Sequence, residues 1–271
     1  MLRTRVLSSA LLIPLVAAAT WAGGWILAAV LFVVVVRSAY ELFHLMEQSA
    51  YRPSLPASAL VMAAFLVSAR FPEAHLTGAV LAAAVIGTLI VQLLRPPKGQ
   101  PTQSWALTLG AALWLGWLIS HFLLLRDLSS PFGFGVGTRW LGLVFLVTWL
   151  NDSAAYFVGK AFGRHPFAPY LSPKKTWEGT AGGVIGGVAG TMLLGHWLVG
   201  LPWLHGLLLG ALVAIVAPLG DLAKSMVKRQ VGVKDFSDLI PGHGGMFDRI
   251  DSLLFVAPVV YCYATFILPL F

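Results

Sequence analysis

A short polar stretch, residues 225–251, interrupts an otherwise apolar chain, and its residue types suit the handling of phosphates and divalent cations. Together with Asp221 and Lys224, it carries five of the eleven carboxylates and five of the eighteen lysines and arginines. Apolar segments flank it at residues 204–217 and 253–271. Each charge drawn toward hydrocarbon costs at least ~2.5–3.5 kcal/mol. A charge cluster beside a membrane span therefore indicates function, and we predict metal and phosphate chemistry at a membrane surface.

The first half of this candidate site lies at the start of the stretch. Asp221, Lys224, Ser225 and Lys228 are spaced i, i+3, i+4 and i+7, which places them on one face of a helix that continues the preceding span. A carboxylate, two ammonium groups and a hydroxyl on one stripe could hold metal and phosphate. The alternative is a solvated helix end on which Asp221 and Lys224 merely pair.

The second half is a glycine turn, residues 241–245, followed by acidic and basic side chains. Gly244 and Gly245 permit positive φ and close approach, so their amides could cradle an anionic oxygen. Asp248 and Asp251 share a helical face, and we expect both in the first turn of the last helix. Since Mg²⁺ prefers a few carboxylates with phosphate oxygens and water, Asp221 and Asp248 form a plausible metal-binding pair. His243 either contacts substrate or is structural.

A further polar cluster precedes these segments. Asp152 lies inside an apolar run, where a carboxylate is a functional candidate by default, unless a neighbouring helix simply satisfies it. Lys174 and Lys175 occupy a loop before the next span. The paired lysines hold a phosphate or merely follow the positive-inside rule, and composition alone leaves both readings open.

The elements that must position these residues are transmembrane helices. The chain of 271 residues is 58% apolar and 11% charged, with a mean hydropathy of +0.82. Its apolar runs repeatedly reach the length that crosses a ~30 Å hydrocarbon core. We predict an all-α polytopic bundle with about nine spans and one integral membrane domain, residues 1–271. Residues 1–140 would form scaffold spans and residues 149–255 the catalytic part. The expected spans are residues 6–22, 25–45, 54–71, 75–95, 104–124, 138–160, 179–199, 203–223 and 252–270.

Two glycine features bear on how these spans connect and pack. Gly23 and Gly24 predict a tight hairpin between the first two spans. The basic start before residues 6–19 could pass for a signal peptide, but the next span follows this hairpin at once, which favours an uncleaved first span. The seventh span is rich in glycines at spacings that allow close helix packing.

The distribution of basic residues predicts the orientation. With alternating spans, fifteen of the eighteen lysines and arginines fall on the side of the N-terminus, and only Arg70, Arg126 and Arg139 fall on the other. The positive-inside rule then places the N-terminus and the polar stretch in the cytoplasm and the C-terminus outside it. The net charge of +7 is spread over loop ends. We therefore expect membrane lipids rather than nucleic acid as partners.

These motifs together resemble a known family. The pattern Ser225-x2-Lys228-Arg229-x4-Lys234-Asp235-x5-Pro241-Gly242-His243-Gly244-Gly245-x2-Asp248-Arg249-x-Asp251 is similar to the C-terminal motif of the phosphatidate cytidylyltransferases, or CDP-diacylglycerol synthases. The resemblance extends to residues 151–159 and 172–179, so it covers about residues 149–255. The sequence matches the family motif at all of its charged positions.

The resemblance implies an activity, substrates and a cofactor. Members of that family transfer a cytidylyl group from CTP to phosphatidic acid, releasing pyrophosphate, and require Mg²⁺; a second cation and a homodimer are left open. It implies an integral protein of a bacterial inner or plasma membrane, with the active-site loops in the cytoplasm.

The resemblance also implies roles for individual residues. Metal ligands would be Asp221 and Asp248, with Asp251 as a further ligand or a neighbour of the ligands. Catalytic residues that hold or orient the phosphates would be Lys228, Arg229, Lys234, Asp235, His243 and Arg249. Substrate-binding residues would be Asp152, Lys174, Lys175, Lys224, Ser225, Gly244 and Gly245.

Three alternatives compete with this interpretation. An ion-coupled transporter would explain Asp152 and the glycine-rich spans, but it predicts charges near the midplane in repeated halves, whereas the charges cluster in two connections. A transferase acting on a polyprenyl or ether-linked phosphate fits the same motifs. A purely structural scaffold gives no reason for the dense acids, bases and glycines.

Overall fold

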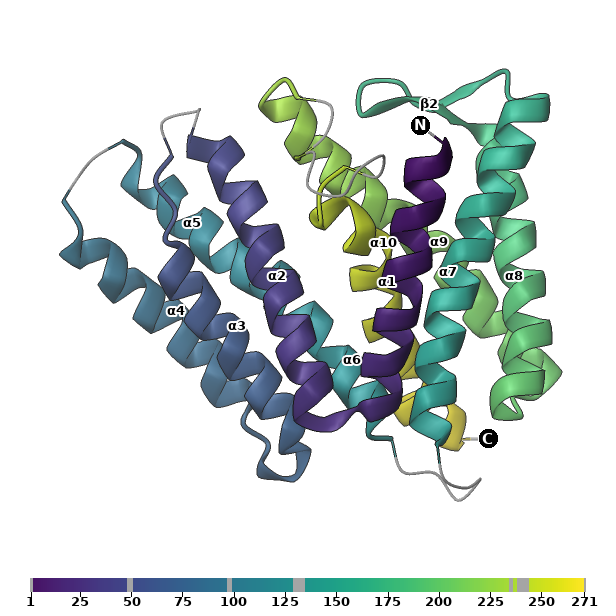
Figure 1. Ribbon diagram of the computed structural model, residues 1–271, viewed down its shortest axis with the longest axis horizontal. Helices are drawn as coiled ribbons and strands as arrows, with labels where there is room; N and C mark the ends of the chain where they lie inside the picture. The colour runs from purple at the N-terminus through teal and green to yellow at the C-terminus, as the bar shows by residue number, and fades with distance from the viewer. Residues whose placement is uncertain are drawn as a thin grey trace. The chain divides into compact units, whose positions relative to one another are not determined.

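The computed structural model describes residues 2–47, 51–96, 99–128, 135–233, 236–237 and 244–270. The chain divides into two units, one formed by Met1–Asp127 and Gln230–Ile250 and the other by Leu128–Arg229 and Asp251–Phe271. The elements, of which Figure 1 labels the α-helices and β2, are, in chain order, α1 (Leu2–Ala22), α2 (Gly24–Glu47), α3 (Leu55–Arg70), η1 (Pro72–Ala74), α4 (Thr77–Leu94), α5 (Pro101–Ala111), η2 (Ala112–Trp117), α6 (Leu118–Arg126), α7 (Val136–Phe162), β1 (Pro166–Ala168), β2 (Ser172–Thr176), α8 (Trp177–Val199), α9 (Trp203–Gln230), α10 (Phe247–Cys262), η3 (Tyr263–Ile267) and η4 (Leu268–Leu270).

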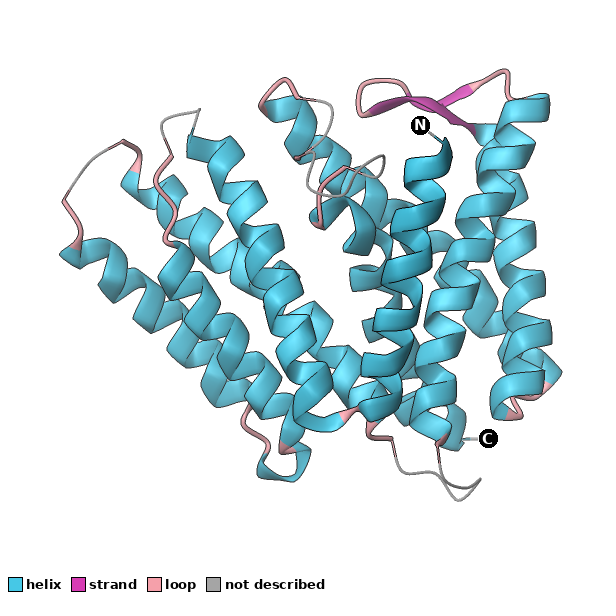
Figure 2. Cartoon of the chain, viewed as in Figure 1, coloured by secondary structure: helices cyan, strands magenta, loops and turns pink. Residues whose placement is uncertain are grey.

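Helix dominates the described part of the chain, as Figure 2 shows. Seven continuous helical stretches among the described residues are long and apolar enough to cross a membrane, and two shorter apolar ones lie at Leu12–Ala22 and Leu55–Arg70. Helices suit such a chain because they satisfy every backbone hydrogen bond internally, which hydrocarbon requires. The protein is therefore a polytopic helical membrane protein, which confirms the predicted fold class.

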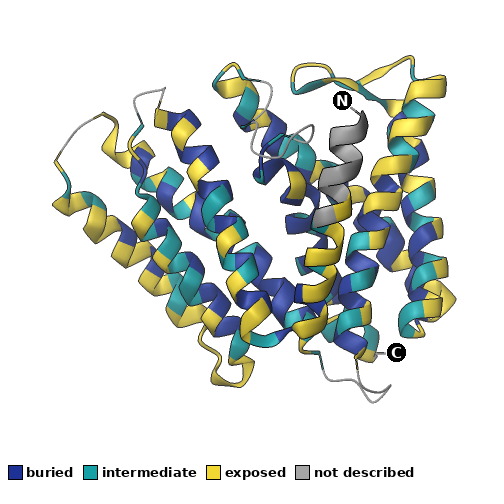
Figure 3. Ribbon diagram, viewed as in Figure 1, coloured by how far each residue is buried: buried dark blue, intermediate teal, exposed yellow. Residues whose placement is uncertain are grey.

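The first unit packs α1 to α6 as neighbouring helices, with α3 contacting α2, α4, α5 and α6. Gly23 and Gly24 have φ of +62° and +55°, which confirms the glycine turn predicted between the first two spans. Arg126 at the end of α6 fixes this turn, because its Nε donates to the Thr20 carbonyl at 2.7 Å. Most of α4 is exposed in Figure 3, with Leu93 and Leu94 among the most exposed apolar residues. In a membrane protein, such a surface faces lipid.

The fifth predicted span is one continuous helical stretch, Pro101–Arg126, with a π-helical segment, η2, in its middle. Within the same unit, a Cβ on Gly116 of η2 would lie 2.8 Å from the Met62 Cα of α3. Only glycine permits two helices to approach this closely. The π-helical segment thus coincides with a close contact between η2 and α3.

The second unit has α7 and α8 in extensive contact. A Cβ on Gly182 would lie 2.5 Å from the Val158 Cβ, and one on Gly179 would lie 2.8 Å from the Ala155 carbonyl oxygen. The glycines of α8 therefore allow close packing, as the sequence predicted.

A β-hairpin precedes α8 and was not predicted. Strands β1 and β2 pair antiparallel, with Pro166 opposite Thr176 and Ala168 opposite Ser172. The expectation of a simple loop over residues 172–179 is therefore corrected. Thr176 ends the hairpin and begins the helix, because its Oγ1 accepts a hydrogen bond from the Gly179 amide at 3.2 Å. The register fixes Lys174 and Lys175 on β2.

Helix α9 continues to Gln230, which confirms that the polar stripe from Asp221 to Lys228 is helical. Within the second unit, α9 passes very close to the start of the Asp251–Phe271 segment. A Cβ on Gly220 would lie 2.5 Å from the Asp251 carbonyl oxygen and 2.9 Å from the Ser252 Cα. This contact brings Asp221 next to Asp251.

Candidate active site

Four charged side chains of the second unit form a chain of ion pairs. Lys175 Nζ lies 2.7 Å from Asp221 Oδ2, and Lys224 Nζ lies 2.8 Å from Asp221 Oδ1. Lys224 Nζ also pairs with Asp251 Oδ2. These residues come from β2, α9 and α10. The structure thus brings together four of the residues that the sequence predicted as substrate or metal ligands.

Local structure explains how each of these side chains is positioned. Asp221 and Lys224 are three residues apart on α9, so they lie on one helix face and reach each other directly. The close approach at Gly220 places Asp251 beside the same face. The β-hairpin holds Lys175 on β2, where its ammonium pairs with Asp221 Oδ2, while Lys224 pairs with Asp221 Oδ1.

Burial varies along this chain of charges. The Lys224 side chain is 8% exposed and that of Asp251 is 12% exposed, whereas those of Asp221 and Lys175 are 31% and 27% exposed. The inner pair is therefore shielded from water, so its electrostatic interaction is strong. The outer pair is open to an approaching ligand.

A third carboxylate completes the cluster. Asp152 on α7 is exposed and lies close enough to Asp251, Asp221 and Lys175 for their charges to interact with it. Its neighbour Asn151 is buried. With every group ionised, three carboxylates face two ammonium groups, and the cluster carries one net negative charge. Such a cluster attracts a cation.

The donor chemistry of this cluster fits Mg²⁺, which binds carboxylate oxygens. Among the described residues, however, no group of three or more His, Cys, Asp and Glu side chains lies close enough together to hold a metal ion. The Lys224 ammonium contacts both Asp221 and Asp251, so its single positive charge already offsets part of their negative charge. A divalent cation that bound both carboxylates would compete with this lysine for them.

Asp248 belongs to the first unit and has backbone partners. Its Oδ2 accepts hydrogen bonds from the Gly245 amide at 3.1 Å and from the Phe236 amide at 3.4 Å. Helix α10 begins at Phe247, so Asp248 is in its first turn. Asp251 lies beyond the first turn, which corrects the expectation for that residue. Gly244 has φ of +79°, which confirms the glycine conformation expected in this turn.

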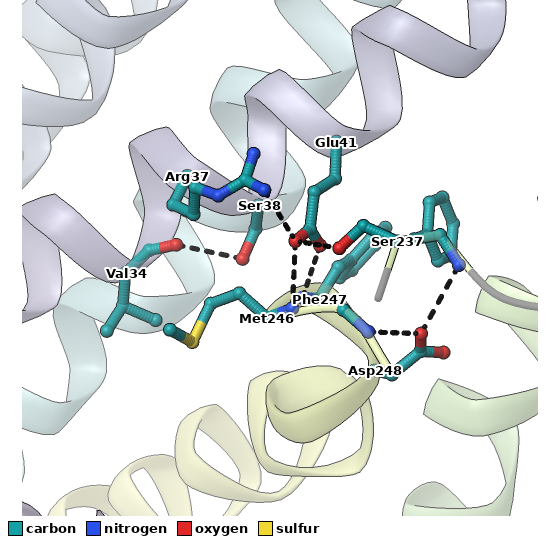
Figure 4. Close-up of polar contacts among 10 residues, drawn as sticks. Val34, Arg37, Ser38, Glu41, Ser237, Met246, Phe247 and Asp248 are labelled. Atoms are coloured by element: carbon teal, nitrogen blue, oxygen red, sulfur yellow. Dashed lines mark hydrogen bonds and ion pairs between the residues drawn. The ribbon is translucent and has the colours of Figure 1, made fainter. Parts of the chain in front are cut away.

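The sequence reasoning missed Glu41, a buried carboxylate on α2 that binds the polar stretch within the first unit. Its Oε1 accepts hydrogen bonds from Ser237 Oγ at 2.6 Å and from the Met246 amide at 3.1 Å. Its Oε2 accepts one from the Phe247 amide at 3.1 Å (Figure 4). The sequence feature that could have identified Glu41 is a carboxylate near the end of an apolar span.

The other predicted residues differ in their exposure and partners. Arg229 is exposed, and its Nε donates to the Leu171 carbonyl of the β-hairpin at 3.0 Å. Lys174 and Arg249 are exposed, Lys228 is half-buried and Ser225 is buried. Three predicted residues, Lys234, Asp235 and His243, lie outside the described part of the chain. Asp221 and Asp248 belong to different units, so their pairing around a metal stays a prediction.

Comparison with known proteins gives matches along the whole chain. The model of the cytidylyltransferase family matches residues 3–267. A protein of Synechocystis named phosphatidate cytidylyltransferase is 34% identical over 289 residues, covering 98% of this chain and 97% of the relative.

Two relatives with the same name match over shorter stretches. The Mycobacterium bovis protein is 44% identical over 119 residues, which is 44% of this chain and 39% of the relative. The Brucella suis protein is 45% identical over 136 residues, which is 50% of this chain and 48% of the relative.

Proposed function

Because the chain belongs to the cytidylyltransferase family, we propose that it transfers a cytidylyl group from CTP to phosphatidic acid, giving CDP-diacylglycerol and pyrophosphate. The observation that carries the proposal is the alignment with the Synechocystis phosphatidate cytidylyltransferase, which spans nearly all of both chains. The cluster of Lys175, Asp221, Lys224 and Asp251 supports it, because such groups suit phosphate transfer.

The reaction joins two anionic phosphates. An oxygen of the phosphatidate monoester attacks the α-phosphorus of CTP, a new phosphorus–oxygen bond forms, and the bond to the β-phosphate breaks as pyrophosphate leaves. The attacking oxygen is already anionic, so it needs no strong general base. The work of the protein is alignment and neutralisation of charge. Lys175 and Lys224 are the ammonium groups of the cluster that would bind phosphate oxygens.

Asp221 and Asp251 are the residues of the second unit that would hold Mg²⁺. The ligand role expected for Asp248 from the sequence stays a prediction. The ion would neutralise negative charge as it develops on the departing pyrophosphate. Lys224, whose ammonium contacts both carboxylates, would bind phosphate oxygens beside them. A second cation and a homodimer stay predictions.

The orientation also belongs to this proposal. The distribution of positive charge supports a cytoplasmic N-terminus and cytoplasmic active-site segments, where CTP is available. The relatives are bacterial proteins, which supports a bacterial inner or plasma membrane. Single cysteines placed in the β-hairpin and in the turn before α4, and labelled from outside intact cells, test this orientation. Modification of the hairpin from outside the cell would overturn it.

The activity is tested with the full-length protein purified in detergent. Labelled CTP and Mg²⁺ are supplied with phosphatidic acid, and in a parallel reaction with a polyprenyl phosphate. Lipid-linked CMP formed only from phosphatidic acid supports the proposal, and product from neither lipid overturns it. Product from the polyprenyl phosphate alone would move the activity to another lipid substrate.

The site assignment is tested by Asp221→Asn in the same assay. We expect activity to fall by at least about a hundredfold, the usual scale for loss of a group that stabilises transition-state charge. The matched control is Glu73→Gln, which neutralises an exposed carboxylate outside the cluster. Full activity in Asp221→Asn would remove this residue from the site.

A further inference from the structure

The start of α10 depends on a side chain from a distant part of the sequence. The first amides of a helix have no partner within it and need a cap. Met246 precedes α10 and has no side-chain oxygen that could serve as one. Asp248 accepts hydrogen bonds from Gly245 and Phe236. The amides of Met246 and Phe247 are bound instead by Glu41 of α2.

Further polar contacts fix the position of the Glu41 carboxylate. Its side chain is 1% exposed, and Arg37, one turn earlier on α2, lies 3.5 Å from Oε1. The Ser237 hydroxyl donates to the same oxygen at 2.6 Å. Figure 4 shows these groups converging on the two carboxylate oxygens. Each oxygen thus has at least one fixed donor, and the carboxylate has little freedom to turn.

The fit between Glu41 and the glycine turn is also steric. A Cβ on Gly245 would lie 2.5 Å from Glu41 Oε2 and 3.1 Å from the Phe236 Cβ. Gly245 does not have positive φ, so its backbone conformation does not require glycine. The close approach of the Glu41 carboxylate is therefore the reason for glycine at this position.

The chemistry of the contact suits a rigid support. An ionised carboxylate forms stronger hydrogen bonds to backbone amides than a neutral acceptor does, and negative charge is favourable at a helix N-terminus. The residues held in this way, Gly244 to Arg249, carry two predicted phosphate-binding amides, a predicted metal ligand and a predicted phosphate-binding arginine. A displacement of the turn would move all of these groups together.

We propose that Glu41 is a positioning residue for the transfer reaction, which holds the turn of residues 244–249 in its working shape through the amides of Met246 and Phe247. It touches no reacting atom and acts through the turn. The inference rests on the proposed function. It assigns a role in that reaction to a residue of the apolar first half of the chain.

The principal test is Glu41→Gln. Glutamine keeps the size of the side chain but presents an NH₂ group to one of the backbone donors, so at least one capping hydrogen bond is lost. We expect kcat to fall by about tenfold to a hundredfold, the range set by loss of a charge-assisted hydrogen bond. The matched control is Glu47→Gln on the same helix, whose side chain is exposed, and we expect it to keep the wild-type kcat.

Hydrogen exchange supplies a readout that does not depend on activity. In Glu41→Gln the amides of Met246 and Phe247 should exchange about tenfold faster or more, while peptides from α7 and α8 exchange as in the wild type. A wild-type kcat or unchanged exchange at these amides would overturn the inference. Faster exchange across the whole protein, with kcat falling only as the folded fraction falls, would show a purely structural role and overturn it too.

A double-mutant cycle tests the contact itself. Gly245→Ala alone should reduce kcat, because the new methyl group collides with Glu41. In a Glu41→Ala background, Gly245→Ala should cost at least about fivefold less than it does alone, the scale expected for residues in direct contact. Additive effects would show that the two residues are uncoupled and would contradict the inference. If the wild type itself makes no product, the proposed function fails, whereas the exchange measurement still tests the contact.

Discussion

The two units hold their carboxylates largely by different means. In the second unit, Asp221 and Asp251 share the ammonium of Lys224, a side-chain partner on a flexible stem. In the first unit, Glu41 and Asp248 each accept hydrogen bonds from two backbone amides, and Glu41 has the side chains of Ser237 and Arg37 as further partners. A side-chain ammonium can move to a phosphate when a cation takes its place, whereas an amide cannot move without reshaping the turn. This difference favours exchange of ligands in the second unit and fixed geometry in the first.

Lys224→Met should have the largest effect, because it removes the ammonium on which the second unit depends. Asp251, 12% exposed, loses its partner in the ion pair. Loss of one partner of a buried pair costs about 3–5 kcal/mol. We expect the lower end of this range, since Asp221 keeps Lys175. Thermal unfolding in detergent should show a lower Tm, and formation of lipid-linked CMP should be lost. Lys160→Met, at an exposed position on α7, is the control.

The same variant tests whether the lysine stands where a cation would bind. In Lys224→Met, Asp221 and Asp251 repel each other without an intervening ammonium. Added Mg²⁺ should therefore raise the Tm of this variant more than that of the wild type. Equal Tm shifts on adding Mg²⁺ to Lys224→Met and to the wild type would contradict the idea that the lysine and a cation compete for the same position.

Gly220→Ala should have the next largest effect. The new Cβ would meet the Asp251 carbonyl oxygen and the Ser252 Cα, which are backbone atoms and cannot turn aside. Overpacking of this kind costs about 1–3 kcal/mol, and it also separates Asp221 from Asp251. Activity per folded molecule should fall by about tenfold or more. The control is Gly142→Ala on α7, where a Cβ meets nothing within 4 Å; comparable losses in both would sink the steric argument.

Gly182→Ala should reduce stability more than activity. Its Cβ would lie 2.5 Å from the Val158 Cβ, and neither residue takes part in the ion pairs of the charge cluster. We expect the free energy of unfolding to fall by about 1 kcal/mol or more, measured by chemical denaturation in detergent. Activity per folded molecule should stay at the wild-type value. A strong loss of turnover at unchanged stability would mean that this helix contact positions the site.

Glu178→Gln should have the smallest effect. Glu178 accepts hydrogen bonds from the amides of Arg164 and His165 at 3.1 and 3.3 Å and pairs with the His165 ring. These contacts lie at the hairpin surface, where ion pairs contribute little. Activity should fall less than about fivefold. A loss as large as that of Lys224→Met would show that the pair belongs to the charge cluster.

The fold was largely predictable because hydrophobic length is a strong signal in a membrane protein. The expected spans correspond to the helices, with ends displaced by a few residues. The hairpin at β1 and β2 was missed, since two strands of three and five residues leave no periodic pattern. The start of α10 at Phe247, which leaves Asp251 beyond the first turn, depends on a cap that comes from outside the helix.

The sequence by itself determined which residues could do chemistry and that Asp221, Lys224, Ser225 and Lys228 share a helix face, because helical spacing is a local property. It also predicted the close packing of α8 from its glycines. Only the tertiary structure decided that Lys224 bridges Asp221 and Asp251, that Lys175 joins them from a hairpin, and that Glu41 caps α10. These contacts join residues as far as 206 positions apart in the chain. Their formation depends on close backbone approaches such as that at Gly220, which no local pattern in the sequence records.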